Sequence, residues 1–364
     1  MPVPWLTEAT LPLSGAYNAR GALGPRRSLR LQLPGLTGAL CTGEAAPLPG
    51  FSIESLDQVR DYLGRAVSPA LFLRKLETLV QAAEAAPGAP LRTGTRSLGE
   101  RLREAPSAPK SATFALDCAL LDGLGQALNR PLWRLLSPAS EVATPPLLPA
   151  SAELLSLHDA GWDERCERAA SSETQTFKLK IGLNFELELD RLHQLRKRAP
   201  EVRLRVDANG QLGNTPELWQ ERLVALAPLG LEFVEEPVPF ALLGEPRPLP
   251  CPLALDESLV RLTPKSEALH AWLASGHLRA LIIKPMLHGG LAAFADWIEC
   301  AARHQIDLVV SHLFDGPIAM AMYRHLAIAH PLRELHTGLG QHSGLQLWPN
   351  RSSLTAPGLG IDAP

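Results

Sequence analysis

The sequence lacks the features of secreted, membrane-spanning and nucleic-acid-binding proteins. Its five cysteines are odd in number, far apart and without any CxxC pair, which excludes a disulfide framework and a zinc site. No stretch approaches the roughly 18 apolar residues of a membrane span, and no basic head precedes an apolar run at the N-terminus. The net charge of -3 gives no electrostatic basis for binding nucleic acid. We therefore expect a soluble, cytoplasmic protein with a small-molecule partner.

Several site motifs are also missing. The eleven histidines form no HxH or HExxH pattern, so we expect most of them to be structural or on the surface, with His312 as a minor site candidate. The segment Gly338-Leu339-Gly340 is no phosphate-binding fingerprint, because it has no third glycine and no helical pattern after it. There is no solenoid repeat, and nothing indicates an oligomeric state.

Five short apolar runs, each ending in a charge, organise the centre of the chain. Successive charges stand 21 to 28 residues apart, which is about the length of one strand-helix unit with its loops. Such units place each charge at the same end of its strand, as at the mouth of a β/α barrel. The charged residues are Lys180, Asp207, Glu235, Asp256 and Lys284.

The length of 364 residues suits a barrel of about 250 residues with a smaller partner domain. Residues 28–41 alternate about Pro34-Gly35 and predict a hairpin, whereas residues 54–85 and the stretch after Pro109 have helical spacing. In that second helix, Asp117 and Asp122 are interpreted as solvated positions or polar links between elements rather than as functional groups. These patterns predict an α+β domain that precedes the barrel.

The expected fold class is α/β: a modified (β/α)8-type, TIM-like barrel with an N-terminal α+β capping domain. Residues 1–139 form the cap, 140–340 the barrel, and 341–364 pack back on the cap. Amphipathic patterns predict barrel helices at 186–198, 217–226, 266–274 and 291–303. The seventh strand is expected at 306–310 and the eighth near 334–336.

Three carboxylates, Asp207, Glu235 and Asp256, follow adjacent predicted strands and should converge. Converging anions repel each other, and a divalent cation is the simplest way to keep all three ionised. Ligation by oxygen alone favours Mg²⁺, with Mn²⁺ next. A single such residue would more simply be a helix N-cap, but three on consecutive strands favour the metal.

Lysines stand on either side of this acidic group. Lys178 and Lys180 are two residues apart on one strand, so they face the same way and should lower each other's pKa. Exposed lysines are the alternative, although a parallel barrel strand has no solvent face. Lys284 ends the sixth strand, across the mouth. Two lysines that flank a metal suit removal of a proton next to a carboxylate, with the metal stabilising the enediolate.

At these residues the chain resembles the enolase superfamily, in its muconate-lactonizing subgroup. The resemblance covers Lys178-Leu179-Lys180, the series Asp207, Glu235 and Asp256, and Lys284. It implies a Mg²⁺ enzyme in which Lys180 removes a proton, Lys284 stabilises the enolate from the other face and Lys178 assists electrostatically. Residues 114–125 and 130–133 also resemble this family.

Residues 43–52 and 283–287 resemble the o-succinylbenzoate synthases of menaquinone biosynthesis. That resemblance implies a lyase that dehydrates 2-succinyl-6-hydroxy-2,4-cyclohexadiene-1-carboxylate to 2-succinylbenzoate, with Ser311 and Gly338 as substrate contacts. The segment 311–317 departs from the serine-rich pattern of such synthases. The eighth strand has no Asp-x-Asp, which counts against a dipeptide epimerase.

Other functions stay open at this point. The same two lysines would serve an N-succinylamino acid racemase, or a related cycloisomerase or epimerase. A Schiff-base aldolase could use Lys284, although the carboxylates would then have no purpose. A non-catalytic binding barrel would leave like charges together without a use.

Overall fold

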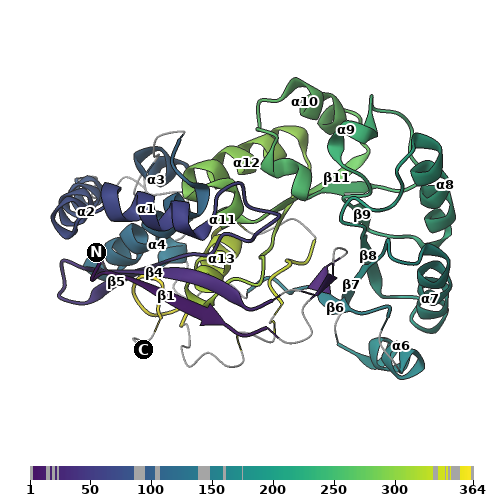
Figure 1. The fold of residues 1–364 in the computed structure, drawn as a ribbon, viewed down its shortest axis with the longest axis horizontal. Coiled ribbons are helices and arrows are strands. Elements are labelled where there is room, and N and C mark those ends of the chain that lie inside the picture. Colours follow the sequence, from purple (N-terminus) through teal and green to yellow (C-terminus); the bar gives the residue numbers. More distant parts are fainter. Residues whose placement is uncertain are drawn as a thin grey trace.

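A computed structural model of the chain describes residues 3–13, 17–18, 21–22, 24–85, 95–102, 107–137, 148–158, 161–173, 175–330, 335–340, 342, 345 and 353–361. Within these residues, two assemblies of secondary structure lie side by side (Figure 1). One is an antiparallel sheet covered by helices, and the other is a curled parallel sheet with helices around it. The α/β fold class expected from the sequence is confirmed.

The antiparallel sheet has the strand order β1-β4-β5. Its strands are β1 (Leu6–Leu11), β4 (Arg26–Pro34) and β5 (Leu40–Ala45). The predicted hairpin is confirmed: Pro34 pairs with Leu40, and the amide of Gly35 donates a 2.9 Å hydrogen bond to Ala39 O across the turn. A separate two-stranded ribbon joins β2 (Tyr17–Asn18) and β3 (Gly21–Ala22).

The helices of this assembly include those predicted at 54–85 and after Pro109. They are α1 (Leu56–Ala66), α2 (Pro69–Glu84), α3 (Thr95–Leu102), α4 (Lys110–Ala127) and α5 (Leu132–Leu136). Of the five, α1, α2 and α4 pack on the sheet, while α3 packs on α12 (Gly290–His304) and was not predicted. Ser55 caps α1 with a capping box, and Ser68 followed by Pro69 starts α2. α4 packs against β5 so closely that a Cβ on Gly43 would lie 2.0 Å from Ala115 O. Only glycine fits at that crossing.

The two acidic residues of α4 are polar links between elements, as predicted. Asp117 Oδ2 accepts a 2.7 Å hydrogen bond from the amide of Leu291, and Asp122 Oδ2 accepts one of 2.9 Å from the amide of Thr42. Both carboxylates are buried. They tie the central helix of the first assembly to its own sheet and to the parallel-sheet region.

The parallel sheet has seven strands in the order β12-β11-β10-β9-β8-β7-β6. They are β6 (Glu153–Leu155), β7 (Thr176–Lys180), β8 (Arg203–Asp207), β9 (Phe233–Glu235), β10 (Leu253–Leu255), β11 (Leu278–Ile283) and β12 (Asp307–Val310). Sequential order with parallel pairing is barrel topology. It brings the strand ends that bear charges to one edge.

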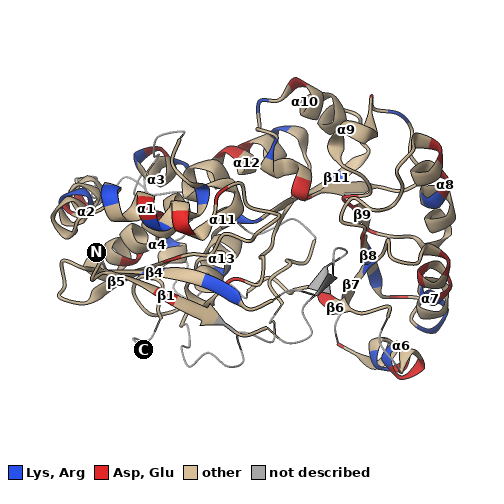
Figure 2. Ribbon diagram, in the orientation of Figure 1, with Lys and Arg blue, Asp and Glu red and all other residues tan. Residues whose placement is uncertain are grey.

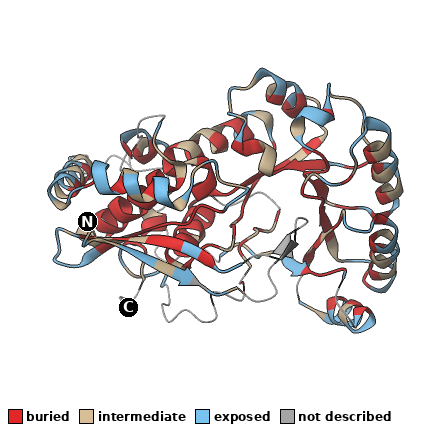
Figure 3. Ribbon diagram, in the orientation of Figure 1, coloured by how far each residue is buried: buried red, intermediate tan, exposed pale blue. Residues whose placement is uncertain are grey.

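Helices between the strands match the predicted ranges to within one residue at each end where a range was predicted. The barrel helices are α6 (Trp162–Ser171), α7 (Phe185–Arg198), α8 (Pro216–Leu226), α9 (Phe240–Leu243), α10 (Glu267–Ala274), α11 (Pro285–His288), α12 (Gly290–His304) and α13 (Pro317–Ala329). Charged residues gather on the outer faces of α7 and α8 (Figure 2), and the strands beneath them are buried (Figure 3). None of the described helices is long and apolar enough to cross a membrane.

The eighth strand was misplaced by the sequence. In the structure, Leu335 and His336 belong to no strand, and Glu334 lies outside the described residues. The two residues after them join the sheet edges through isolated parallel bridges, Thr337 to Ser151 and Gly338 to Ser311. Thr337 exchanges backbone hydrogen bonds with Ala150 and Ala152, and Gly338 donates one to Val310, so the segment closes the gap between the two sheet edges.

The segment 353–361 lies against α4 and α5. The amide of Leu132 donates to Gly358 O at 3.1 Å, and the amide of Leu359 donates to Asp122 Oδ1 at 2.9 Å. The expected domain boundaries at 139, 140 and 341 stay a prediction, and residues 138–147 fall outside the described part of the chain.

Candidate active site

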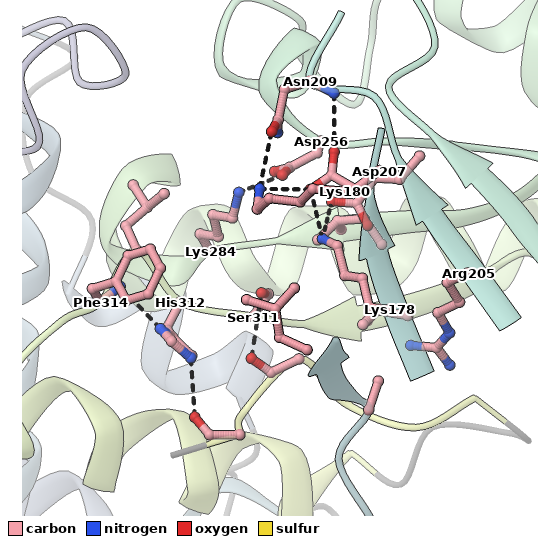
Figure 4. Close-up of a pocket in the computed structure, with 18 of the residues that line it drawn as sticks. Lys178, Lys180, Arg205, Asp207, Asn209, Asp256, Lys284, Ser311, His312 and Phe314 are labelled. Atoms are coloured by element: carbon pink, nitrogen blue, oxygen red, sulfur yellow. Dashed lines mark hydrogen bonds and ion pairs between the residues drawn. The ribbon is translucent and has the colours of Figure 1, made fainter. Parts of the chain in front are cut away.

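A cavity of about 360 Å³ opens at the carboxyl ends of the parallel strands. Every site residue predicted from the sequence lines this cavity. These residues are Lys178, Lys180, Asp207, Glu235, Asp256, Lys284, Ser311 and Gly338. Figure 4 shows lysines and carboxylates on one side and the segment after β12 on the other. The structure therefore brings the predicted residues together, and their roles are proposals.

Strand register explains why the first four charges meet. Lys180 pairs with Asp207 across β7 and β8, and Asp207 pairs with Glu235 across β8 and β9. Lys178, two residues earlier on β7, faces the same interior. Its Nζ lies 2.6 Å from Glu235 Oε1 and 3.0 Å from Asp207 Oδ2, while Lys180 Nζ lies 3.2 Å from Asp207 Oδ2.

The remaining pair comes from farther round the sheet. Asp256 follows β10, and Lys284 follows β11. The Lys284 ammonium donates a hydrogen bond to Asp256 Oδ2 (Figure 4), and both side chains are buried. Lysines from opposite parts of the sheet thus contact the same cluster of three carboxylates, Asp207, Glu235 and Asp256.

The lowered lysine pKa expected from the sequence is wrong for Lys178. Burial by itself lowers the pKa of this ammonium, but the negative charges of Asp207 and Glu235 outweigh burial and raise the pKa. Burial also raises the pKa of Glu235, to about 7, against the opposing effect of Lys178. The expected lowering counted a neighbouring ammonium and a divalent cation, whereas the charges closest to Lys178 in the structure are the carboxylates.

The chemistry of the donors fits a divalent cation, although the side chains as placed do not surround one point. Within the described ranges, no three carboxylate, histidine or cysteine groups are close enough to hold an ion as they stand. Lysine ammonium groups contact the carboxylates instead. Asp256 Oδ1 is buried and has no hydrogen-bond partner in the described part of the chain. Such an oxygen, beside two further buried carboxylates, is a suitable Mg²⁺ ligand.

Two polar residues of the site were missed by the sequence analysis. Lys180 Nζ donates a 2.9 Å hydrogen bond to Asn209 Oδ1, and Asn209 Nδ2 donates one of 2.8 Å to Glu257 Oε1. Asn209 has a φ of 42°, in the left-handed region that asparagine tolerates better than most residues. The available signal was position, because Asn209 and Glu257 follow the metal candidates Asp207 and Asp256 on the same loops.

A third missed residue, Glu236, supports the loop after β10. Its Oε2 accepts a 2.8 Å hydrogen bond from the amide of Asp256, and its Oε1 accepts one of 3.1 Å from the amide of Ser258. Glu236 has a φ of 40°, a strained value for a glutamate. This carboxylate therefore fixes the backbone on which Asp256 stands.

The opposite side of the cavity is formed by Ser311 and the closing segment. Ser311 Oγ lies 3.5 Å from Gly338 O, and a Cβ on Gly338 would lie 2.5 Å from Ser311 Oγ. Glycine keeps this part of the cavity open. His312 also lines the cavity, whereas His288 and His325 are buried and hydrogen-bonded inside the fold, which agrees with the structural role expected for most histidines.

Comparison with known proteins agrees with this architecture. The family described as enolase C-terminal domain-like matches residues 162–362. An o-succinylbenzoate synthase of Desulfotalea psychrophila is 28% identical over 237 residues, which are 63% of this chain and 62% of that protein. An L-Lys-D/L-Arg epimerase of Methylococcus capsulatus is 30% identical over 242 residues, 65% of this chain and 64% of that protein.

Among solved structures, a dipeptide epimerase from Methylococcus capsulatus complexed with a Mg ion superposes with a TM-score of 0.70. It is 25% identical and covers 99% of this chain and 98% of its own. The matched region spans less than two thirds of the length of either curated relative above. These relatives differ in activity, so the matches give the superfamily and leave the reaction to be argued from the site.

Proposed function

Because this chain belongs to the enolase superfamily, we propose that it is a Mg²⁺-dependent o-succinylbenzoate synthase. The reaction is dehydration of 2-succinyl-6-hydroxy-2,4-cyclohexadiene-1-carboxylate to 2-succinylbenzoate, which makes the enzyme a carbon-oxygen lyase of menaquinone biosynthesis. The enzyme would act in the cytoplasm on this small-molecule carboxylate. The observation that carries the proposal is the meeting of Lys180 and Lys284 with three buried carboxylates in one cavity.

The two lysines divide the proton chemistry. The neutral amine of Lys180 takes the proton from the carbon next to the substrate carboxylate. The electron pair left on that carbon forms the new double bond as the neighbouring carbon-oxygen bond breaks. The Lys180 ammonium then returns its proton to the departing hydroxyl, which leaves as water. The positive charge of Lys284 stabilises the carboxylate as negative charge develops on it.

Asp207, Glu235 and Asp256 would hold the cation, and Glu236 keeps the loop of Asp256 in place. When bound, Mg²⁺ would supply positive charge to the substrate carboxylate and offset the carboxylates that now raise the pKa of Lys178. Mn²⁺ is a suitable substitute by the same oxygen chemistry. Lys178 contributes positive charge beside Glu235 and does not itself transfer the proton.

An N-succinylamino acid racemase is the second candidate. Lys180 on β7 and Lys284 after β11 lie in one cavity and could remove an α proton and return it on the other face. A dipeptide epimerase is disfavoured, because the closing segment is Thr337-Gly338-Leu339-Gly340 and has no Asp-x-Asp.

The test incubates purified protein and Mg²⁺ with the cyclohexadiene substrate in one reaction and with an N-succinylamino acid in another. Loss of the diene absorbance reports dehydration, and exchange of the α proton of an N-succinylamino acid with deuterium reports racemase chemistry. We expect the diene to be consumed. Exchange without dehydration would replace the synthase assignment by the racemase.

A further inference from the structure

Three rings form one wall of the cavity. His312 and Phe314 come from the loop after β12, and His342 comes from the segment that follows the closing bridges. The ring centroids of Phe314 lie 5.8 Å from His312 and 5.6 Å from His342, both edge-on, and those of the two histidines are 5.2 Å apart. We call these three residues the aromatic wall. Each ring contacts the other two, so the wall acts as one surface (Figure 4 shows His312 and Phe314).

Hydrogen bonds orient both imidazoles of the wall. His312 Nε2 donates to Gly340 O at 3.2 Å, and its Nδ1 accepts from the amide of Phe314 at 2.9 Å. His342 Nε2 donates to Asp315 O at 2.9 Å. Carbonyl oxygens can only accept, which sets the tautomer of both rings. Burial lowers the pKa of His312 to about 3 and also lowers the pKa of His342, so the wall is uncharged at neutral pH.

The loop that bears the wall is strained and held from outside. Phe314 has a φ of 55°, a value that aromatic residues rarely adopt. Asp315 Oδ2 accepts hydrogen bonds from the amide of Leu313 and from Tyr323 Oη, each 3.0 Å long. A φ of this kind persists only where surrounding contacts over-determine it. Asp315 supplies those contacts.

Asp315 is in turn held by the antiparallel sheet. Arg26, the first residue of β4, pairs its Nη2 with Asp315 Oδ1 at 2.9 Å, and both side chains are at most 3% exposed. Arg26 Nη1 also donates to Pro47 O at 3.1 Å. A buried pair that loses one partner leaves an uncompensated charge, so the two residues depend on each other. The conformation of the wall therefore depends on a residue nearly 290 positions earlier in the chain.

We propose that the aromatic wall binds the uncharged, planar part of a carboxylate substrate, and that Arg26 and Asp315 are positioning residues that hold the wall. This inference rests on the proposed function in one respect: it takes the substrate carboxylate to lie beside Lys180 and Lys284. Planar unsaturated groups pack well against ring edges and faces. A ligand with a free ammonium group is expected to bind less well, because the wall has two neutral imidazoles, one phenyl ring and no carboxylate to pair with the charge.

The experiment measures binding rather than turnover, so that it does not depend on the reaction. Calorimetry of the 364-residue chain with Mg²⁺ compares N-acetylphenylalanine, N-acetylleucine and the dipeptide Ala-Phe. The wild-type protein should bind the first most tightly. Phe314→Leu should reduce the preference for the planar ligand about 3- to 10-fold and leave Mg²⁺ affinity unchanged.

The positioning role is tested in the same assay. Arg26→Met and Asp315→Asn should each reduce the preference as Phe314→Leu does, and combining either with Phe314→Leu should cause no further loss. Arg27→Met, an exposed neighbour on β4 that pairs with Glu8, is the matched control and should change nothing. If Arg26→Met does not fold, Arg26→Lys is used in its place. Lysine keeps the positive charge but lacks the planar guanidinium group that bonds Asp315 and Pro47 at the same time, so the preference should still fall.

Three results would overturn the inference: no preference in the wild type, an unchanged preference in Phe314→Leu, or tightest binding of the dipeptide. The proposed function is judged separately. Absence of diene dehydration with the planar preference intact would remove the synthase assignment and keep the wall. Dehydration of the diene together with an unchanged preference in Phe314→Leu would keep the synthase assignment and remove the proposed role of the wall.

Discussion

The ammonium of Lys180 donates a 2.9 Å hydrogen bond to Asn209 Oδ1. The amide nitrogen of the same asparagine donates to Glu257 Oε1 at 2.8 Å, so Asn209 links the lysine to that glutamate. The bond orients the nitrogen that we assign as the base. A lysine has a long, flexible side chain, so its aim depends on such partners.

Removal of the Asn209 side chain should therefore weaken catalysis without removing a reacting group. We expect Asn209→Gly to lower kcat roughly 10- to 100-fold, the range for residues that orient functional groups. Glycine is chosen because the φ of 42° suits it. Steady-state kinetics with the preferred substrate, together with Mg²⁺ calorimetry, checks this expectation.

The matched control is Asn129→Gly. Asn129 also has a left-handed φ, of 50°, but follows α4 away from the cavity. It should retain wild-type kinetics. Equal kcat in Asn209→Gly and the wild type would show that the bond to Lys180 has no role in positioning.

The assignment of the base predicts a difference between the two lysines. Lys180→Met should lower proton removal by about 10²- to 10⁴-fold, the usual contribution of a general base. Lys284→Met should also impair turnover, because it removes the positive charge assigned to stabilise the substrate carboxylate. Deuterium exchange at the substrate carbon, followed by NMR, separates the two effects. The exposed Lys265→Met serves as control, and undiminished exchange in Lys180→Met would refute the assignment.

Local sequence patterns were enough to predict much of the site. A charge at the end of a short apolar run predicts a strand end, and repetition of that pattern predicts a shared edge. Lys180, Asp207 and Glu235 were found this way, and the register of β7, β8 and β9 brings them together. The hairpin of β4 and β5 followed from alternation alone.

Other features depend on contacts between distant segments and could not be predicted. The raised pKa of Lys178 results, against the effect of burial, from carboxylates on two neighbouring strands. The left-handed φ of Phe314 is held by Arg26 from another sheet through Asp315. The closure at Gly338 consists of single bridges, which leave no strand pattern in the sequence.

The metal proposal predicts a change in stability. Addition of Mg²⁺ to protein stripped with EDTA should raise the free energy of unfolding, by about 2.7 kcal/mol at 100 times the Kd. Thermal unfolding with increasing Mg²⁺ measures the effect. Asp256→Asn should reduce it, because the substitution removes a ligand charge, while Glu299→Gln on the surface should not. A melting temperature independent of Mg²⁺ in the wild type would contradict the site.

Acid sensitivity of the fold is expected from His325, which is buried and does not line the cavity. Its Nδ1 accepts from the amide of Trp133 at 3.1 Å, and its Nε2 lies 3.3 Å from Leu359 O. Burial lowers the pKa of this imidazole from its ordinary value of 6.5 to about 4. Between these values the unfolded chain binds a proton that the folded chain does not, so stability falls as the pH falls from 6.5 toward 4.

At pH 5 the loss from this residue should be about 2 kcal/mol, at 1.36 kcal/mol for each unit of pH below 6.5. Urea unfolding at pH 7 and pH 5 measures it. His325→Gln can keep a donor and an acceptor but has no proton to gain, so its stability should change less between the two pH values. His193→Gln, at an exposed position of α7, should behave as the wild type does. If His325→Gln loses as much stability at pH 5 as the wild type, the acid sensitivity arises from other groups.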